Sequence, residues 1–355
     1  GLDIGEAPDD AFQPLTGDDK KTATALRARN RRERGGQGSF LREMFAEAEE
    51  TTAAELEHEL AEIETLDEDD LETVALKAEV FQDYLDSPAY RRKRDEYDLW
   101  TAAFVWPIPA GDAEMMLAPT VAELDKRRRY WTENEPLTQQ ARQIAQRHRF
   151  FHWELAFPTV FRRAPDPKGF IGDSLHTATR AANPWGLEGG FDVVLSNPPW
   201  ERIKLQEKEW FASRSPEIAA APNAAARKRM IAALEQEDPA LYAPYLADLR
   251  AAEGESAFIR TSGKYPLCGR GDVNTYAVFA ELARLVLNPV GRAGVIVPSG
   301  IATDDTTKFF FQDINSTKTL ASLYSFENEE FIFPDIHHAT KFCLLTLTGS
   351  SGHVV

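Results

Sequence analysis

The sequence of 355 residues is poor in cysteine, in long apolar runs and in positive charge. Its two cysteines, Cys268 and Cys343, show no pairing pattern and no metal-ligand spacing, so neither a disulfide framework nor a metal centre is expected. No stretch approaches the roughly 18 uninterrupted apolar residues that a membrane span requires, and the first residues have no secretory pattern. We therefore expect a cytoplasmic protein with no membrane partner.

The net charge is -17, and most of the acidic excess lies in one region. Residues 41–98 carry 20 Asp and Glu against 6 Lys and Arg, so the remaining residues are nearly neutral. A domain that binds DNA through its phosphates alone usually has a basic excess. Any DNA contact is therefore expected to be local or to lie outside this chain. The basic clusters 28–34 and 91–94 and the acidic cluster 66–70 are interpreted as solvated faces or ends of helices.

Composition divides the chain into three regions. Residues 1–39 are polar, show no sustained period and are predicted to be a flexible segment of mixed charge. Residues 40–150 repeat apolar side chains at helical spacing, which predicts a helical spacer or inserted domain. Residues 151–355 alternate strand and helix patterns and are interrupted by an Ala-rich helical insertion at 201–262. This insertion either contacts DNA, covers the site as a lid or is a solvated helical excursion.

The third region has the pattern of an α/β domain. The apolar run 191–196 is typical of a strand buried on both faces of a parallel sheet, and 293–299 is a second such run. An amphipathic helix is predicted over 275–287. The runs 319–326 and 340–348 indicate an antiparallel hairpin that closes the sheet. The expected fold is half of a doubly wound α/β domain.

The tetrapeptide Asn197-Pro198-Pro199-Trp200 follows the first of these strands directly. Open α/β sheets bind ligands beyond the carboxyl ends of their strands, so this position favours a functional site. Two prolines stiffen the loop and can hold the Asn197 amide oxygen and the next carbonyl at a defined separation. Two such acceptors suit the two N–H bonds of an exocyclic amine, and Trp200 offers a face to a flat heterocycle. The motif predicts that positioning of an amine promotes its attack on an activated methyl group.

The segment FDVVLSNPPW resembles motif IV of the class I S-adenosylmethionine-dependent amino-methyltransferases, where (N/D/S)PP(Y/F/W) binds the target amine. Residues 269–301 and 331–347 follow in the order of motifs V, VI and VIII of the γ-type adenine-N6 DNA methyltransferases. The sequence looks most like the large restriction-modification and phage-defence methylases, over about residues 97–349. The resemblance implies a Rossmann-like methyltransferase fold, S-adenosylmethionine as cofactor and DNA as partner.

The resemblance also assigns roles on the base side of the site. Asn197 and the Pro198 carbonyl would accept the hydrogen bonds of the adenine amine, and Trp200 would stack on the flipped base. Phe333 falls where the family places a second aromatic ring against the opposite face of that base. Stacking between two rings would recover part of the free energy spent in flipping the base.

On the cofactor side the match is incomplete. Asp173 corresponds to the motif III acid that faces the cofactor's adenine ring, and Asn274 and Tyr276 are expected to line the same crevice. The glycine-rich turn of motif I is absent, because the glycines of residues 34–40 follow no predicted strand. The chain is therefore expected to be the catalytic fragment of a larger polypeptide, with cofactor-binding strands before its first residue and a DNA-reading domain after its last. Alone, the fragment would bind cofactor poorly.

Two other functions fit the same residues. One is methyl transfer to another planar amine, in RNA or in a protein glutamine. The other is a non-catalytic scaffold or DNA-binding subunit that keeps a degenerate methyltransferase fold. His152 and the pair His337-His338 lack the partners of a metal site, and we interpret them as structural residues.

Overall fold

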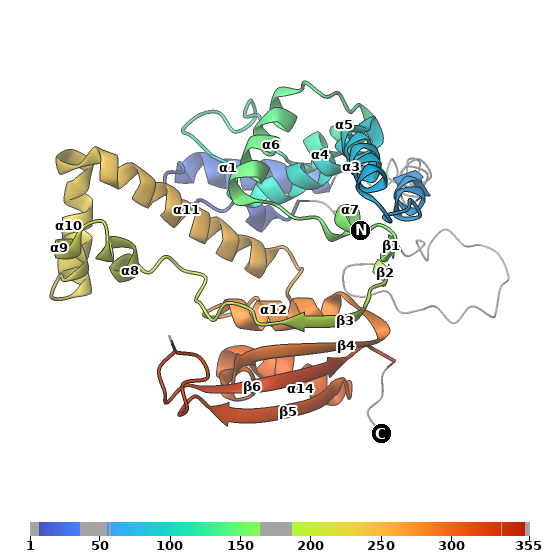
Figure 1. The fold of residues 1–355 in the computed structure, drawn as a ribbon. Coiled ribbons are helices and arrows are strands. Elements are labelled where there is room, and N and C mark those ends of the chain that lie inside the picture. Colours follow the sequence, from blue (N-terminus) through green and yellow to red (C-terminus); the bar gives the residue numbers. More distant parts are fainter. Residues whose placement is uncertain (1–6, 36–54, 57, 164–186, 335, 352–355) are drawn as a thin grey trace.

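The computed structural model describes residues 7–35, 55–56, 58–163, 187–334 and 336–351. A helical half, formed by the amino-terminal segments, lies above a half that contains the main sheet (Figure 1). A long helix, α11 (Pro239–Thr261), runs between the two halves. None of the helices in the described part of the chain is long and apolar enough to cross a membrane.

The helical half is built from helices whose first turns carry side-chain caps. Asp19 caps α1, Asp70 forms a reciprocal capping box with Thr73 at α3, and Ser87 caps α4, which has Pro88 in its first turn. Part of the acidic cluster 66–70 thus serves as a cap. The helices are η1 (Asp9–Phe12), α1 (Lys20–Arg34), α3 (Leu71–Asp86), α4 (Pro88–Ala102), η2 (Ala103–Val105), α5 (Val121–Arg129), α6 (Pro136–His148) and α7 (Trp153–Ala156).

Helix α1 corrects the expectation of a flexible segment over residues 1–39. Its Ala23 and Leu26 are buried in the helical core, together with Phe12 of η1. The fully buried Asn30 donates to the Ala7 carbonyl at 2.9 Å and accepts from the Val121 N–H at 3.0 Å. Residues 7–35 are thus a structural part of the helical half, because their polar groups find partners that are distant in sequence.

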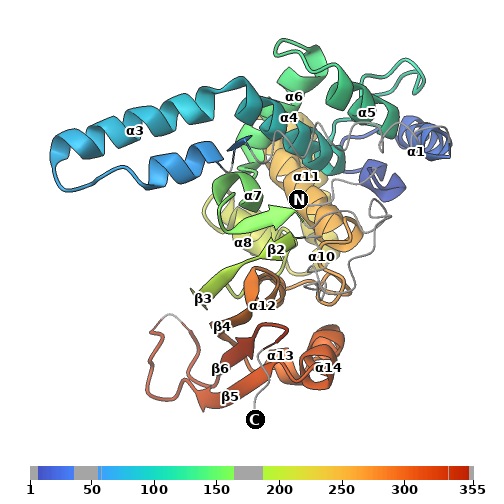
Figure 2. The same cartoon turned by 90° about the vertical axis from the view of Figure 1, so that its right-hand side faces the viewer.

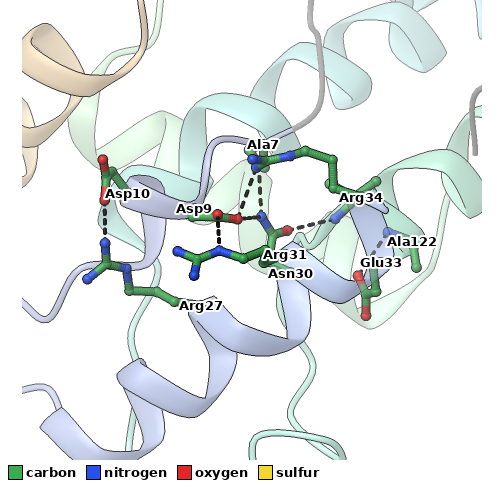
Figure 3. Close-up of polar contacts among 10 residues, drawn as sticks. Ala7, Asp9, Asp10, Arg27, Asn30, Arg31, Glu33, Arg34 and Ala122 are labelled. Atoms are coloured by element: carbon green, nitrogen blue, oxygen red, sulfur yellow. Dashed lines mark hydrogen bonds and ion pairs between the residues drawn. The ribbon is translucent and has the colours of Figure 1, made fainter. Parts of the chain in front are cut away.

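The basic cluster at the end of α1 is paired within the protein (Figure 3). Arg31 and Arg34 form ion pairs with Asp9, at 3.0 and 3.1 Å. Arg27 pairs with Asp10 in the same way. The cluster therefore fixes η1 to α1, and its charges are largely neutralised by carboxylates. This agrees with the interpretation that it is a helix end.

The insertion after the site is helical, as predicted for 201–262. It contains α8 (Glu207–Ala212), α9 (Pro216–Ala219), α10 (Ala224–Glu237) and α11 (Pro239–Thr261). The first three pack with α11 around the buried Phe211, and α11 then returns along the helical half. Arg250 of α11 donates to Asp18 at 2.6 Å and to the Trp106 carbonyl at 2.8 Å.

The main sheet has four strands in the order β3-β4-β6-β5. β3 is parallel to β4, whereas β6 is antiparallel to both β4 and β5, so the predicted closing hairpin is confirmed. The arrangement is a mixed α/β fold, which fits the expected methyltransferase-like class. The strands are β3 (Phe191–Ser196), β4 (Leu287–Pro298), β5 (Leu320–Glu327) and β6 (Lys341–Thr348), with a separate pair β1 (Phe161–Arg163) and β2 (Leu187–Gly189). The other elements of this half are α12 (Thr275–Leu285), α13 (Gly300–Thr303), η3 (Asp305–Thr307) and α14 (Lys308–Ser316).

The two faces of this sheet differ, and the difference corrects the expectation for residues 191–196. One face packs against α12, α13 and α14 through Val295, Leu345 and their neighbours, and Figure 2 shows α13 and α14 on one side of β5 and β6. On the other face, Val193 and Leu195 of β3 are 63% and 81% exposed. β3 is an edge strand of the described sheet and is not buried on both faces. Helices therefore cover one face of the described sheet, where a doubly wound domain would cover both.

Candidate functional site

The Asn197–Trp200 loop begins where β3 ends, at the carboxyl edge of the parallel strand pair. Asn197 and Pro199 are exposed, Pro198 is buried and Trp200 is half-buried. The loop therefore presents the Asn197 amide to solvent while its proline and tryptophan anchor it.

Thr275, the first residue of α12, holds this loop in place. Its hydroxyl donates to the Pro199 carbonyl at 2.6 Å and accepts from the Glu201 N–H at 3.0 Å. Its own N–H donates to the Glu201 carbonyl at 2.8 Å. One residue thus bonds to the backbone on both sides of Trp200, although the sequence analysis did not select it. The only signal was its place directly after Asn274, because a hydroxyl near a helix start commonly bonds to backbone groups.

Asn274 and Tyr276, both expected to line the crevice, have different environments. Asn274 lies beside the continuation of the loop, where it forms an antiparallel bridge with Arg202. Tyr276 is buried in the core beneath the sheet, and its hydroxyl is 3.5 Å from a carboxylate oxygen of Asp304. Burial, together with the charge of Asp304, raises the pKa of Tyr276 to about 12. Asn274 thus lies next to the continuation of the loop, whereas Tyr276 belongs to the core against which Trp200 packs.

The ring of Trp200 belongs to a cluster of aromatic side chains. Its indole N–H donates to the Ile296 carbonyl on β4 at 3.3 Å. Its ring centroid is 5.7 Å from that of Phe333 and 6.4 Å from that of Phe342. Phe342 also stacks on Phe326, with centroids 5.6 Å apart. The structure therefore brings Trp200 and Phe333 together.

The two rings do not form an open slot. Trp200 and Phe333 meet edge to face, with an interplanar angle of 68°. Atoms in contact lie about 3.5–4.0 Å apart, so a flat base held between parallel rings separates them by roughly 7 Å. A base can thus stack on Trp200 only if the ring of Phe333 moves aside or turns.

Asn328 organises the loop that carries Phe333. This residue, at the end of β5, is fully buried. Its amide nitrogen donates to the Phe333 carbonyl at 3.0 Å and to the Ile336 carbonyl at 2.9 Å, while its amide oxygen accepts from the Phe333 N–H at 3.0 Å. The amide group is thus saturated by the loop backbone. Sequence reasoning missed it, because an isolated Asn after a strand is usually a turn residue.

A cavity of about 470 Å³ lies beside the loop, between its continuation and α11. Its basic lining residues are Arg202, Lys204 and Arg260, and Glu253 and Asp272 are the acidic ones. Three basic and two acidic side chains thus line the cavity, and Arg202 lies 3.9 Å from Asp272.

The predicted cofactor side of the site is described only in part. Asp173, the proposed partner of the cofactor's adenine ring, lies outside the described residues. Within the described ranges, no G-x-G turn directly follows a strand. The described part also contains no group of three or more His, Cys, Asp or Glu side chains that could hold a metal ion. His152 is buried and lies 2.8 Å from Asp98, which fits a structural role.

Comparison with known proteins gives one match. Residues 72–230 match the family model described as Eco57I restriction-modification methylase. This range includes the Asn197–Trp200 loop, the strand before it and much of the helical half. No curated protein and no solved structure matches the chain. Over these residues the chain is thus similar to restriction-modification methylases, which supports a DNA methyltransferase of such a system.

Proposed function

We propose that the chain is the catalytic part of an adenine-N6 DNA methyltransferase of a restriction-modification or phage-defence system, with S-adenosylmethionine as methyl donor. The observation that carries the proposal is the pinned Asn197–Trp200 loop at the carboxyl end of β3. The family match over residues 72–230 supports the same class of enzyme.

In this proposal the loop binds and orients the target amine. The Asn197 amide oxygen and the Pro198 carbonyl each accept a hydrogen bond from one of its two N–H groups. These two bonds orient the amine so that the nitrogen lone pair points toward the methyl donor. Thr275 keeps the loop from rearranging when the amine binds, because it bonds on both sides of Trp200. Pre-organisation of this kind lowers the barrier without a general base of shifted pKa.

The aromatic cluster supports the flipped base. Trp200 is fixed by its bond to Ile296 and by Phe342, so its orientation is set before the base arrives. Phe333 turns away from its edge-to-face contact and then covers the second face of the base. Stacking on each ring stabilises the extruded base by about 1–3 kcal/mol.

The donor enters the proposal only as a substrate of the complete enzyme. S-adenosylmethionine supplies a methyl group that is already activated for transfer. We propose that residues outside the described part hold it, and we assign no step of its binding to the described side chains. The local basic residues Arg202, Lys204 and Arg260 are the proposed contacts to the DNA backbone.

Methyl transfer to unmethylated DNA tests the proposal directly. The chain, expressed with the remainder of its polypeptide where there is one, is incubated with labelled S-adenosylmethionine and DNA, RNA or protein. We expect label in the adenines of DNA. Asn197→Ala is expected to lower the transfer rate by about 10²–10³, the effect of removing one aligned hydrogen-bonding group in other enzymes.

Asn134→Ala is the matched control, because Asn134 is an exposed Asn in the helical half, far from the site. Equal rates for the two variants would overturn the role of Asn197. Label in RNA or in glutamine side chains, and none in DNA, would overturn the DNA substrate. Calorimetric titration of the chain alone with S-adenosylmethionine tests whether the donor site lies elsewhere, and tight binding would contradict that part.

A further inference from the structure

We infer that Phe331 and Ile332, at the tip of the loop 328–334, form an apolar wedge that enters the DNA base stack beside the flipped base. The inference rests on the proposed function and deepens it, since it assigns a second task to the loop that carries Phe333. It concerns residues that neither the motif comparison nor the family match singles out.

The tip exposes two large apolar side chains in succession. Phe331 is 54% exposed and Ile332 is 60% exposed, on a turn of the kind that is usually polar. Scattered apolar residues on a surface need no explanation, but two adjacent ones beside a functional site do. Phe and Ile are among the side chains that proteins insert between base steps.

The backbone of the tip is strained and locked. Phe331 has a φ of 51°, a left-handed conformation that a bulky L-residue rarely adopts. Its N–H donates to the Asn328 carbonyl at 2.8 Å. The Asn328 side chain then fixes Phe333 from both its N–H and its carbonyl. Backbone strain of this kind persists only where surrounding contacts hold the residue in place, and it is common at functional sites.

The position of the tip matches the task. Phe333 is the next residue but one after Phe331, and its ring contacts Trp200 of the Asn197–Trp200 loop. A base that stacks on Trp200 leaves a gap in its duplex, and the tip adjoins the residue that covers this base. Apolar side chains that fill the gap prevent the base from returning to the stack.

The charge around the tip does not favour attraction to DNA phosphates. Glu329 and Glu330 precede the tip and both are exposed. Two carboxylates would repel the DNA backbone, so electrostatic attraction does not bring this tip to the duplex. Insertion between bases does not depend on such attraction, and the exposed faces of Phe331 and Ile332 suit it.

A DNA duplex with a single abasic site tests the wedge without methyl transfer. The duplex spans about two helical turns and carries 2-aminopurine beside the gap, and the perfectly paired duplex of the same sequence is the reference. Because stacking on one aromatic ring contributes about 1–3 kcal/mol, the protein is expected to bind the abasic duplex about tenfold more tightly. Insertion of Phe331 is also expected to change the 2-aminopurine fluorescence.

The double variant Phe331→Ser with Ile332→Ser is expected to lose the preference while binding the paired duplex within about twofold of the unaltered protein. The control is Leu71→Ser with Met115→Ser, which removes exposed apolar side chains from the helical half and should keep the preference. Retention of the preference by the tip variant, or its absence from the unaltered protein, would overturn the inference.

These outcomes are separable from failure of the proposed function. Asn197→Ala should keep the abasic preference while losing methyl transfer, because Asn197 lies outside the tip. If Asn197→Ala retains transfer but the tip variant loses the preference, the proposed role of the loop fails and the wedge stands. If the tip variant instead loses binding to every duplex and unfolds at a lower urea concentration, Phe331 and Ile332 are structural residues and the wedge is overturned.

Discussion

The helical core and the sheet core differ in how many charged side chains they bury. Within the helical half, the buried Asp95 accepts both hydrogen bonds of a bidentate Arg142, at 2.6 and 2.7 Å, and one from the Trp131 indole at 2.8 Å. His152 likewise contacts Asp98 beside the core. The sheet core is made mainly of small and branched apolar side chains from β4, β6 and the helices beneath them.

The difference follows from what each element presents. A strand alternates its side chains, so one face of β4 and β6 can be wholly apolar. The helices of the other half carry many charged residues, and α4 contains Lys93, Asp95 and Asp98 among its buried positions. Their packing is stable only where each buried charge has a partner. Paired buried charges therefore add to apolar packing in the helical half, whereas the sheet core relies mainly on packing.

The largest expected effect comes from breaking the charge network. Asp95→Ala leaves the Arg142 guanidinium and the Trp131 N–H without their acceptor and is expected to lower the free energy of unfolding by about 3–5 kcal/mol. Urea titration followed by circular dichroism measures it. Asp305→Ala is the control, because its exposed pair with Lys308 contributes only about 0–1 kcal/mol. Similar losses in the two variants would remove the distinction between buried and exposed charge.

The contribution of apolar packing is tested by substituting two adjacent residues on opposite faces of β6. Leu345 is fully buried beneath the sheet, whereas Leu344 is 39% exposed on the open face. Leu345→Ala is expected to destabilise the protein by about 2–4 kcal/mol through lost burial and a cavity. Leu344→Ala is expected to cost less than about 1 kcal/mol. The same titration measures both, and equal costs would mean that the open face is covered in solution.

The smallest expected effect is a dependence of stability on pH in the acid range. Its sign for Glu96 in the helical half is opposite to its sign for Glu281 in the sheet half. Burial alone would raise the pKa of Glu96, but Lys93 and Arg128 outweigh it and lower the pKa to about 2. The unfolded pKa is near 4.5, so this contribution is present above that pH and is lost as the pH falls toward 2. For Glu281, burial raises the pKa above 4.5, so its contribution is present below pH 4.5 and is lost as the pH rises through the folded value.

Urea titrations at several pH values between about 2 and 6 measure these slopes. Glu96→Gln should flatten the loss of stability in acid, because the amide cannot titrate. Glu281→Gln is the matched control in the sheet half and should steepen that loss. A Glu96→Gln variant with the unaltered acid slope would show that its ion pairs do not contribute.

The sequence predicted the elements whose side-chain pattern is local. The strand 191–196, the helix that starts at Thr275 and the closing hairpin all appear within about two residues of their expected bounds, because alternation and helical spacing are read from neighbouring residues. It did not predict which face of β3 is covered. An apolar run shows that a strand can be buried, but not what lies against it. The domain boundaries at 39, 150 and 201–262 stay predictions.

At the candidate site, the Asn197–Trp200 loop and Phe333 were selected from sequence and lie together. Thr275 and Asn328, which hold the two loops in place, were not. Their importance depends on backbone groups that become neighbours only after folding, and a single Thr or Asn carries no periodic signal. Helix α1 was missed for a related reason. Its Arg31 pairs with Asp9, which lies 22 residues earlier in the sequence.

The contacts of α11 impose an order on folding during synthesis. Glu253 accepts from the Thr16 backbone N–H at 2.6 Å and from its hydroxyl at 3.0 Å, and these partners are 237 residues apart. Arg250 reaches Asp18 across 232 residues. A chain made from its amino terminus therefore holds Thr16 and Asp18 without these partners until α11 has left the ribosome. The helical half, although made first, is completed only after the Asn197–Trp200 loop has been synthesised.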